Sequence, residues 1–153
     1  MRKTAIGLCA SLVLLMSCNK VQLPIATSLG NLVRIEKVDR VSNDEGGVSP
    51  AAGEVLYVLS FEGKKELPAP GMLPLVDPAG KESRPVFAGS PTKEGALTRK
   101  QWRYNGAMTA QDGKWIFEGT LLLPEPKVTL VYAVPTDAAG WLLKDGERKH
   151  RVF

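Results

Sequence analysis

The chain has 153 residues, of which 44% are hydrophobic and 24% charged, and its formal net charge is +4. This hydrophobic content is typical of a globular protein and argues against wholesale disorder, while the small net charge gives no reason to expect a nucleic acid as partner. The 15 glycines and 11 prolines indicate many turns, which favours an all-β chain over a helical one.

The first 17 residues have the organisation of an export signal. Arg2 and Lys3 form a short basic segment, and residues 5–16 are almost wholly apolar. A run of about a dozen apolar residues suits the core of a signal peptide, whereas a membrane-spanning helix needs about twenty. Loss of this segment would remove two positive charges and leave the mature chain close to neutral.

The run closes on Leu15-Met16-Ser17-Cys18, which resembles the bacterial lipobox, an aliphatic and a small residue before a cysteine. The resemblance implies cleavage between Ser17 and Cys18 and acylation of Cys18. Several acyl chains make a stable anchor, because each buried methylene contributes about 0.8 kcal/mol and one chain is marginal. The alternative is an ordinary secretory signal with Cys18 as a bystander. Asn19 replaces the Asp that tends to hold lipoproteins at the inner membrane, which favours the outer membrane.

The sequence contains two cysteines, Cys9 and Cys18. Cys9 lies in the expected signal peptide and Cys18 would be acylated, so the mature chain would have no thiol for a disulfide. Its stability must then come from core packing and strand pairing. Residues 18–31 show no clean period and are expected to form the lipidated N-terminus and a tether, with an edge strand as the alternative for part of it.

Residues 32–153 show strand signals separated by turns. Residues 32–38 alternate in part, and residues 54–61 are apolar on both faces, as in a central strand covered on two sides. The polar residues 39–53 between them predict a loop. The proline-rich stretch 68–74 predicts an extended crossing.

The second half predicts two hairpins and two long strands. Residues 73–76 and 83–87 flank Asp77-Pro78-Ala79-Gly80, which suits a type I turn, and residues 141–143 and 148–153 flank Asp145-Gly146, a favoured hairpin dipeptide. Strands are also expected at the following positions: residues 100–104, 115–123 and 127–134. A polar loop is expected at residues 89–95 and a connection at residues 105–113. This spacing of short strands indicates a β-sandwich.

The order of these segments is also similar to that of a known family. Residues 53–61, 75–82 and 123–135 resemble the telokin-like, immunoglobulin-like extracytoplasmic domains of bacterial lipoproteins, a family without assigned function. The resemblance covers residues 32–143 and implies an immunoglobulin-like β-sandwich over residues 32–153. It transfers no catalytic residue, because the family pattern contains none.

The residue types needed for catalysis are scarce. A hydrolase needs a nucleophile, a base and an orienting acid, and the single histidine, His150, lies within the basic run 148–151. No serine lies in a Gly-x-Ser-x-Gly setting. With one histidine and no free thiol, a transition-metal site is not expected either. We predict no enzyme, no catalytic residue and no cofactor.

Three features have both a functional and a structural interpretation. Asp39, Asp44 and Glu45 could hold calcium, but they lack the Asp-x-Asp-x-Asp spacing and a solvated loop is favoured. The basic run 148–151 could bind phosphates or acidic sugars, or could protect a strand edge from pairing, which we favour. The three tryptophans, at positions 102, 115 and 141, could stack on sugars, but their apolar strand patterns favour the core, with Trp102 the expected exception.

These features predict a membrane-anchored extracytoplasmic lipoprotein that acts as a binding or assembly module of the bacterial envelope. Its partners would be the membrane, through the N-terminal lipid, and an envelope protein. Binding residues are expected in loops 39–53 and 89–95, because binding sites concentrate on loops. The alternatives are a structural envelope protein without a small-molecule ligand and, less favoured, an envelope enzyme.

Overall fold

The computed structural model describes residues 20–69 and 73–153. The expected signal peptide, the cleavage position Ser17 and the acylation position Cys18 lie outside the described residues. The described residues contain strands and no helix, so the all-β prediction is confirmed. The strands form three antiparallel sheets and have these bounds: β1 (Ile25–Thr27), β2 (Gly30–Val38), β3 (Glu54–Glu62), β4 (Glu66–Ala69), β5 (Leu75–Val76), β6 (Glu82–Ser83), β7 (Phe87–Pro91), β8 (Leu97–Thr98), β9 (Arg103–Gln111), β10 (Lys114–Leu122), β11 (Lys127–Pro135), β12 (Leu142–Asp145) and β13 (Arg148–Arg151).

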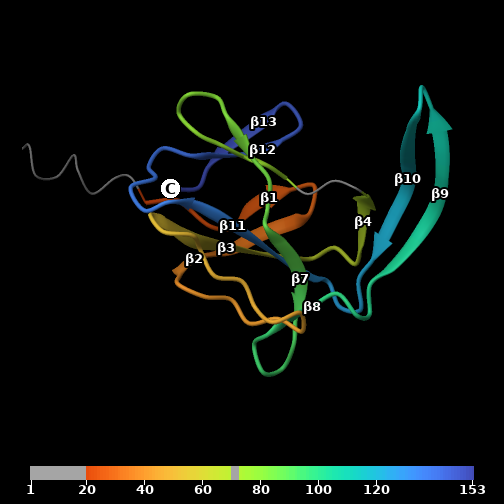
Figure 1. Cartoon of the computed structure of the whole chain (residues 1–153), viewed down its shortest axis with the longest axis horizontal. Helices are drawn as coiled ribbons and strands as arrows, with labels where there is room; N and C mark the ends of the chain where they lie inside the picture. The colour runs from red at the N-terminus through yellow and green to blue at the C-terminus, as the bar shows by residue number, and fades with distance from the viewer. Residues whose placement is uncertain (1–19, 70–72) are drawn as a thin grey trace, which may run out of the picture.

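The largest sheet has six strands in the order β1-β2-β3-β11-β7-β8 (Figure 1). β3 lies at its centre and pairs with β2 on one side and along its whole length with β11 on the other. These are the two segments whose residues are apolar on both faces. The buried pattern of β3 confirms the prediction of a central strand covered on two sides, and β11, predicted as a strand, shows the same pattern.

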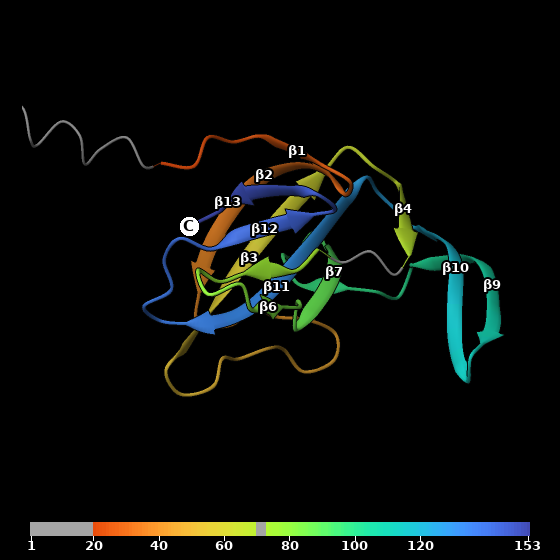
Figure 2. The same ribbon diagram turned by 90° about the horizontal axis from the view of Figure 1, so that it is seen from above.

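One face of the six-stranded sheet packs against a four-stranded sheet with the order β13-β12-β5-β6 (Figure 2). Leu59 of β3, Leu130 of β11 and Leu143 of β12 are fully buried in the main core between them. Tyr132 is also fully buried there, and its hydroxyl donates a hydrogen bond of 2.6 Å to the carbonyl oxygen of Leu73. The arrangement is therefore β-sandwich-like.

The other face of the six-stranded sheet is covered in part by loop 39–53. Val41 of this loop and Leu97 of β8 pack on Val58 and Val131 in a second, smaller core. Backbone hydrogen bonds of 2.9 and 2.8 Å between Val41 and Val48 close the loop on itself. The predicted loop is confirmed, and its role is to cover apolar side chains.

The predicted hairpins form, with small changes of extent. Asp77 accepts hydrogen bonds from the amides of Gly80 (3.0 Å, to its carbonyl) and Lys81 (2.8 Å, to its carboxylate), which closes the predicted turn between β5 and β6. β12 and β13 pair around a turn with Gly146 at φ 61°. Ile25–Thr27 forms an edge strand, the alternative allowed for part of the tether.

Two expectations about loops are wrong. Residues 105–111, expected to be a connection, belong to β9, and residues 89–91, expected to begin a loop, belong to β7. The predicted extended crossing starts within β4, an edge strand that tolerates Pro68 because it is paired on one side only, and residues 70–72 of the crossing lie outside the described residues. In each case the strand forms because a neighbouring strand supplies backbone hydrogen bonds, and these cannot be predicted from the local sequence.

The third sheet, with the order β4-β10-β9, leaves the body of the molecule. Figure 1 and Figure 2 both show β9 and β10 as a hairpin that projects from one end of the long axis. The N-terminal end of the described chain lies toward the opposite end. The hairpin is thus the part of the described chain most open to contacts with another molecule.

Candidate functional sites

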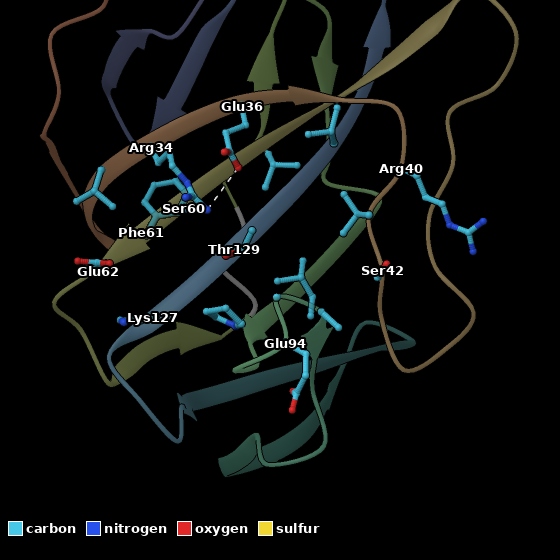
Figure 3. Close-up of a pocket in the computed structure, with 18 residues that line it drawn as sticks. Arg34, Glu36, Arg40, Ser42, Ser60, Phe61, Glu62, Glu94, Lys127 and Thr129 are labelled. Carbon is cyan, nitrogen blue, oxygen red and sulfur yellow. Dashed lines mark ion pairs between the residues drawn. The ribbon is translucent and has the colours of Figure 1, made fainter.

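An open groove of about 880 Å³ lies on the outer face of the six-stranded sheet (Figure 3). Its floor carries Ser60 of β3 and Thr129 of β11, and Arg34 pairs with Glu36 of the same strand at 3.4 Å. Both partners of this ion pair are largely exposed. Surface pairs of this kind contribute little energy. The groove therefore has a lining of mixed polar and apolar side chains and offers no buried charged group to orient a ligand.

Loop 39–53, one of the two loops expected to carry a binding site, bonds to β8 and to Arg99, which follows it. Asp44 accepts a hydrogen bond of 2.9 Å from the Thr98 hydroxyl, and Glu45 forms an ion pair of 2.9 Å with Arg99. The amide of Leu97 donates to the carbonyl of Ser42 at 2.9 Å. Within residues 20–69 and 73–153, no cluster of three His, Cys, Asp or Glu side chains is placed to hold a metal ion.

His150 lies in β13, opposite Leu143 of β12. Its Nε2 atom is buried and meets no hydrogen-bond partner among the described residues. Its neighbours in the basic run point outward on the exposed edge of the four-stranded sheet. Charged side chains on an edge strand hinder its pairing with other chains, which agrees with the favoured interpretation of this run.

An exposed ion pair links two strands of the same sheet. The Lys144 ammonium of β12 contacts the Glu82 carboxylate of β6. The hydrogen bond from Lys144, followed by its charge, lowers the pKa of Glu82, and the same contact raises the pKa of Lys144. Because the pair is open to water, it contributes little to the free energy of folding. Its effect is to orient the short β5–β6 hairpin relative to β12.

The three tryptophans differ in environment. Trp141 is buried in the main core, and Trp102 is partly buried, with its indole N–H donating a hydrogen bond of 2.7 Å to the Ser90 hydroxyl. Trp115, near the tip of the hairpin, is 71% exposed. The expectation of core packing is therefore wrong for Trp115, and the expected exception, Trp102, packs against the core.

Trp115 belongs to an apolar surface that we name the apolar hairpin face. Directly opposed residues of an antiparallel ladder share one face of the sheet, and the register pairs Trp115 with Ala110, Gly119 with Gly106, and Leu121 with Tyr104. Met108 lies between Gly106 and Ala110 on the same side. Tyr104 is 64% exposed and Met108 58% exposed.

The opposite face of the hairpin is mainly polar. It carries Lys114 opposite Gln111 and Glu118 opposite Ala107. The apolar hairpin face is buried at one end and exposed over the rest: Leu121 packs in the main core, whereas Met108 and Trp115 are largely exposed to water. An exposed apolar surface of this kind marks a site of contact with another molecule. Sequence reasoning missed this site, although the alternation from Tyr104 to Ala110 and the Asp112-Gly113 dipeptide were signals for it.

Backbone conformation shapes the hairpin at two points. Asp112 and Gly113 have φ values of 52° and 74°, as a two-residue type I′ turn requires. Gly106 and Gly119 oppose each other so closely that a Cβ atom on Gly119 would lie 2.7 Å from the Gly106 Cα atom and would clash with the Asn105 carbonyl oxygen. The pair leaves a bare strip across the apolar hairpin face.

Comparisons with known proteins add no assignment: no protein-family model, no curated protein and no solved structure matches the chain. Among the described residues, no helix is long and apolar enough to cross a membrane.

Proposed function

We propose that the chain is a lipid-anchored, extracytoplasmic lipoprotein of the bacterial envelope, with an immunoglobulin-like β-sandwich, that acts as an assembly module by binding protein. The lipobox-like sequence ending at Cys18 supports the anchor. The β-sandwich-like packing of two antiparallel sheets supports the domain type. The proposal assigns the chain no catalytic activity.

The observation that carries the binding role is the exposure of three large apolar side chains on the apolar hairpin face: Tyr104, Met108 and Trp115. Tryptophan and tyrosine are enriched among the residues that dominate the energy of protein interfaces. Burial of apolar surface contributes about 25 cal/mol per Å², so side chains of this size can hold a partner only if it covers most of them.

The position of the hairpin suits a protein partner better than the anchoring membrane. β9 and β10 project from one end of the long axis, and the described chain begins toward the other (Figure 2). A chain anchored before its first described residue can therefore extend the hairpin away from the lipid. The groove of Figure 3 is the weaker candidate, since its ion pair is exposed and its polar groups do not converge on one point.

Photo-cross-linking on intact cells tests this function. A photoreactive amino acid at position 115 should yield protein adducts, identified by mass spectrometry, because Trp115 lies on the apolar hairpin face. The same amino acid at position 118 is the matched control, since Glu118 lies on the polar face of the same strand. Equal adduct yields at the two positions, or none at position 115, would contradict the proposal.

A further inference from the structure

We propose that the partner bound by the apolar hairpin face is a second copy of this chain, joined through antiparallel pairing of β9 with β9 of that copy. This inference rests on the proposed assembly function and names its partner. The two three-stranded sheets would form one continuous sheet with the order β4-β10-β9-β9-β10-β4. A two-fold axis perpendicular to the sheet would lie between the two copies of β9, beside Ala107 of each.

The first argument is the open edge of β9. β9 is the outer strand of its sheet, and all nine of its residues are exposed. Gln111 and Lys114 flank the two-residue turn and form a hydrogen-bonded pair, so alternate residues of β9 direct their N–H and C=O groups away from β10. Gly106, Met108 and Ala110 are among these. A long exposed edge of this kind is a template for pairing with another strand.

The second argument is that β9 is complementary to itself. With Ala107 opposite Ala107 of the second copy, Gly106 lies opposite Met108, and Tyr104 lies opposite Ala110. Each large side chain then faces a small one, and residues that direct backbone groups outward face each other, as a hydrogen-bonded ladder requires. A register shifted by two residues would place Met108 opposite Met108 and leave the glycine strip uncovered.

In this register a side chain of the second copy covers the glycine strip, the bare part of the apolar hairpin face at Gly106 and Gly119. Gly106 and Gly119 approach too closely to allow side chains, which leaves the apolar hairpin face bare at that point. Met108 of the second copy, lying beside Gly106, covers the strip. In this register Ala110 lies between Trp115 of its own chain and Tyr104 of the second copy. The two aromatic rings can therefore meet over the small alanine side chain.

Charge permits a dimer, and area sets how far the contact must extend. Arg103 lies opposite the neutral Gln111 of the second copy, so no like charges oppose each other across the contact. A specific interface buries at least about 1,000 Å² in total, so the contact must cover the apolar hairpin face as well as the edge of β9.

Cysteine cross-linking of the full chain on intact cells tests the register. Ala107 would face its own copy in a non-hydrogen-bonded pair with Cα atoms about 4.5 Å apart, within the range that a disulfide spans. Oxidation with copper–phenanthroline should therefore convert Ala107→Cys to a disulfide-linked dimer. Thr109→Cys is the matched control on the same face, because two copies of position 109 would lie about 13 Å apart.

Ala107→Cys should give at least about tenfold more dimer than Thr109→Cys, while co-expressed Asn105→Cys and Thr109→Cys chains should cross-link with each other. The unchanged chain measures background from Cys9 and Cys18. Equal dimer yields from Ala107→Cys and Thr109→Cys would overturn the self-pairing.

A size measurement in detergent is independent of thiol chemistry. Met108→Glu should shift the chain from dimer to monomer in light scattering, because two carboxylates would then lie diagonally across the axis, whereas Met108→Leu should remain dimeric. Dimers that survive Met108→Glu would count against the pairing.

Failure of this inference can be told from failure of the proposed function. Heterologous adducts from position 115, with Ala107→Cys monomeric, would overturn self-pairing and keep the assembly role. No adduct of any kind from position 115 would overturn both.

Discussion

Replacement of Trp115 by Ala, compared with the same change at Trp141, tests whether the hairpin tryptophan serves binding or folding. Trp141 is buried in the main core and lies 6.0 Å, centroid to centroid, from the Phe153 ring. Loss of a core tryptophan costs about 3–5 kcal/mol. Trp115 is 71% exposed, so its replacement should cost no more than about 0.5–1 kcal/mol of unfolding free energy.

Urea unfolding followed by far-ultraviolet circular dichroism measures both costs without relying on tryptophan fluorescence. Dilute protein is required, because mass action would otherwise add the stability of any dimer to the result. Trp115→Ala should then unfold near the midpoint of the unchanged chain, while Trp141→Ala unfolds well below it. A loss above about 2 kcal/mol for Trp115→Ala would refute the reasoning, since a side chain that exposed cannot contribute so much to folding.

Three other predictions concern the core, the hairpin and the anchor. Tyr132→Phe removes the hydroxyl that donates to Leu73 and should lower the unfolding free energy by about 1–2 kcal/mol. Because burial raises the pKa of Tyr132, its contribution to stability is present below the ordinary phenol pKa of about 10 and is lost as the pH rises above it. The urea midpoint of the unchanged chain should therefore fall more steeply above about pH 10 than that of Tyr132→Phe, and parallel slopes would contradict this. Gly119→Ala should speed hydrogen exchange of the β9–β10 amides about tenfold or more, because the added Cβ atom clashes with the opposing backbone. Protection equal to that of the unchanged chain would count against the clash. Cys18→Ala should release the protein from membranes in a fractionation, and retention equal to that of the unchanged chain would count against lipidation.

Where local signals were strong, the sequence predicted the structure well. The segments that became β3 and β11 are apolar at nearly every position, and only a strand covered on both faces can bury such a pattern. The turn at Asp77 was predictable because its side-chain and backbone oxygens cap the turn within five residues.

The missed elements depend on partners distant in sequence. Residues 105–111 contain glycine, alanine and asparagine, which have low strand propensity, and β10 alone supplies their pairing. The exposure of Trp115 could not be predicted either, because an alternating apolar pattern is the same whether the apolar face of the strand packs on a core or faces water.

The sequence by itself determined the strand periods, the turn positions and the absence of helices in the described chain, because these follow from side-chain alternation and backbone preference over a few residues. Only the tertiary structure decided which apolar faces are covered. Leu143 and Trp141 pack in the core between the two sheets of the body, whereas the β9–β10 hairpin projects from the body and leaves Trp115 exposed to water. Burial depends on what packs against a face, and that is set by contacts between segments far apart along the chain.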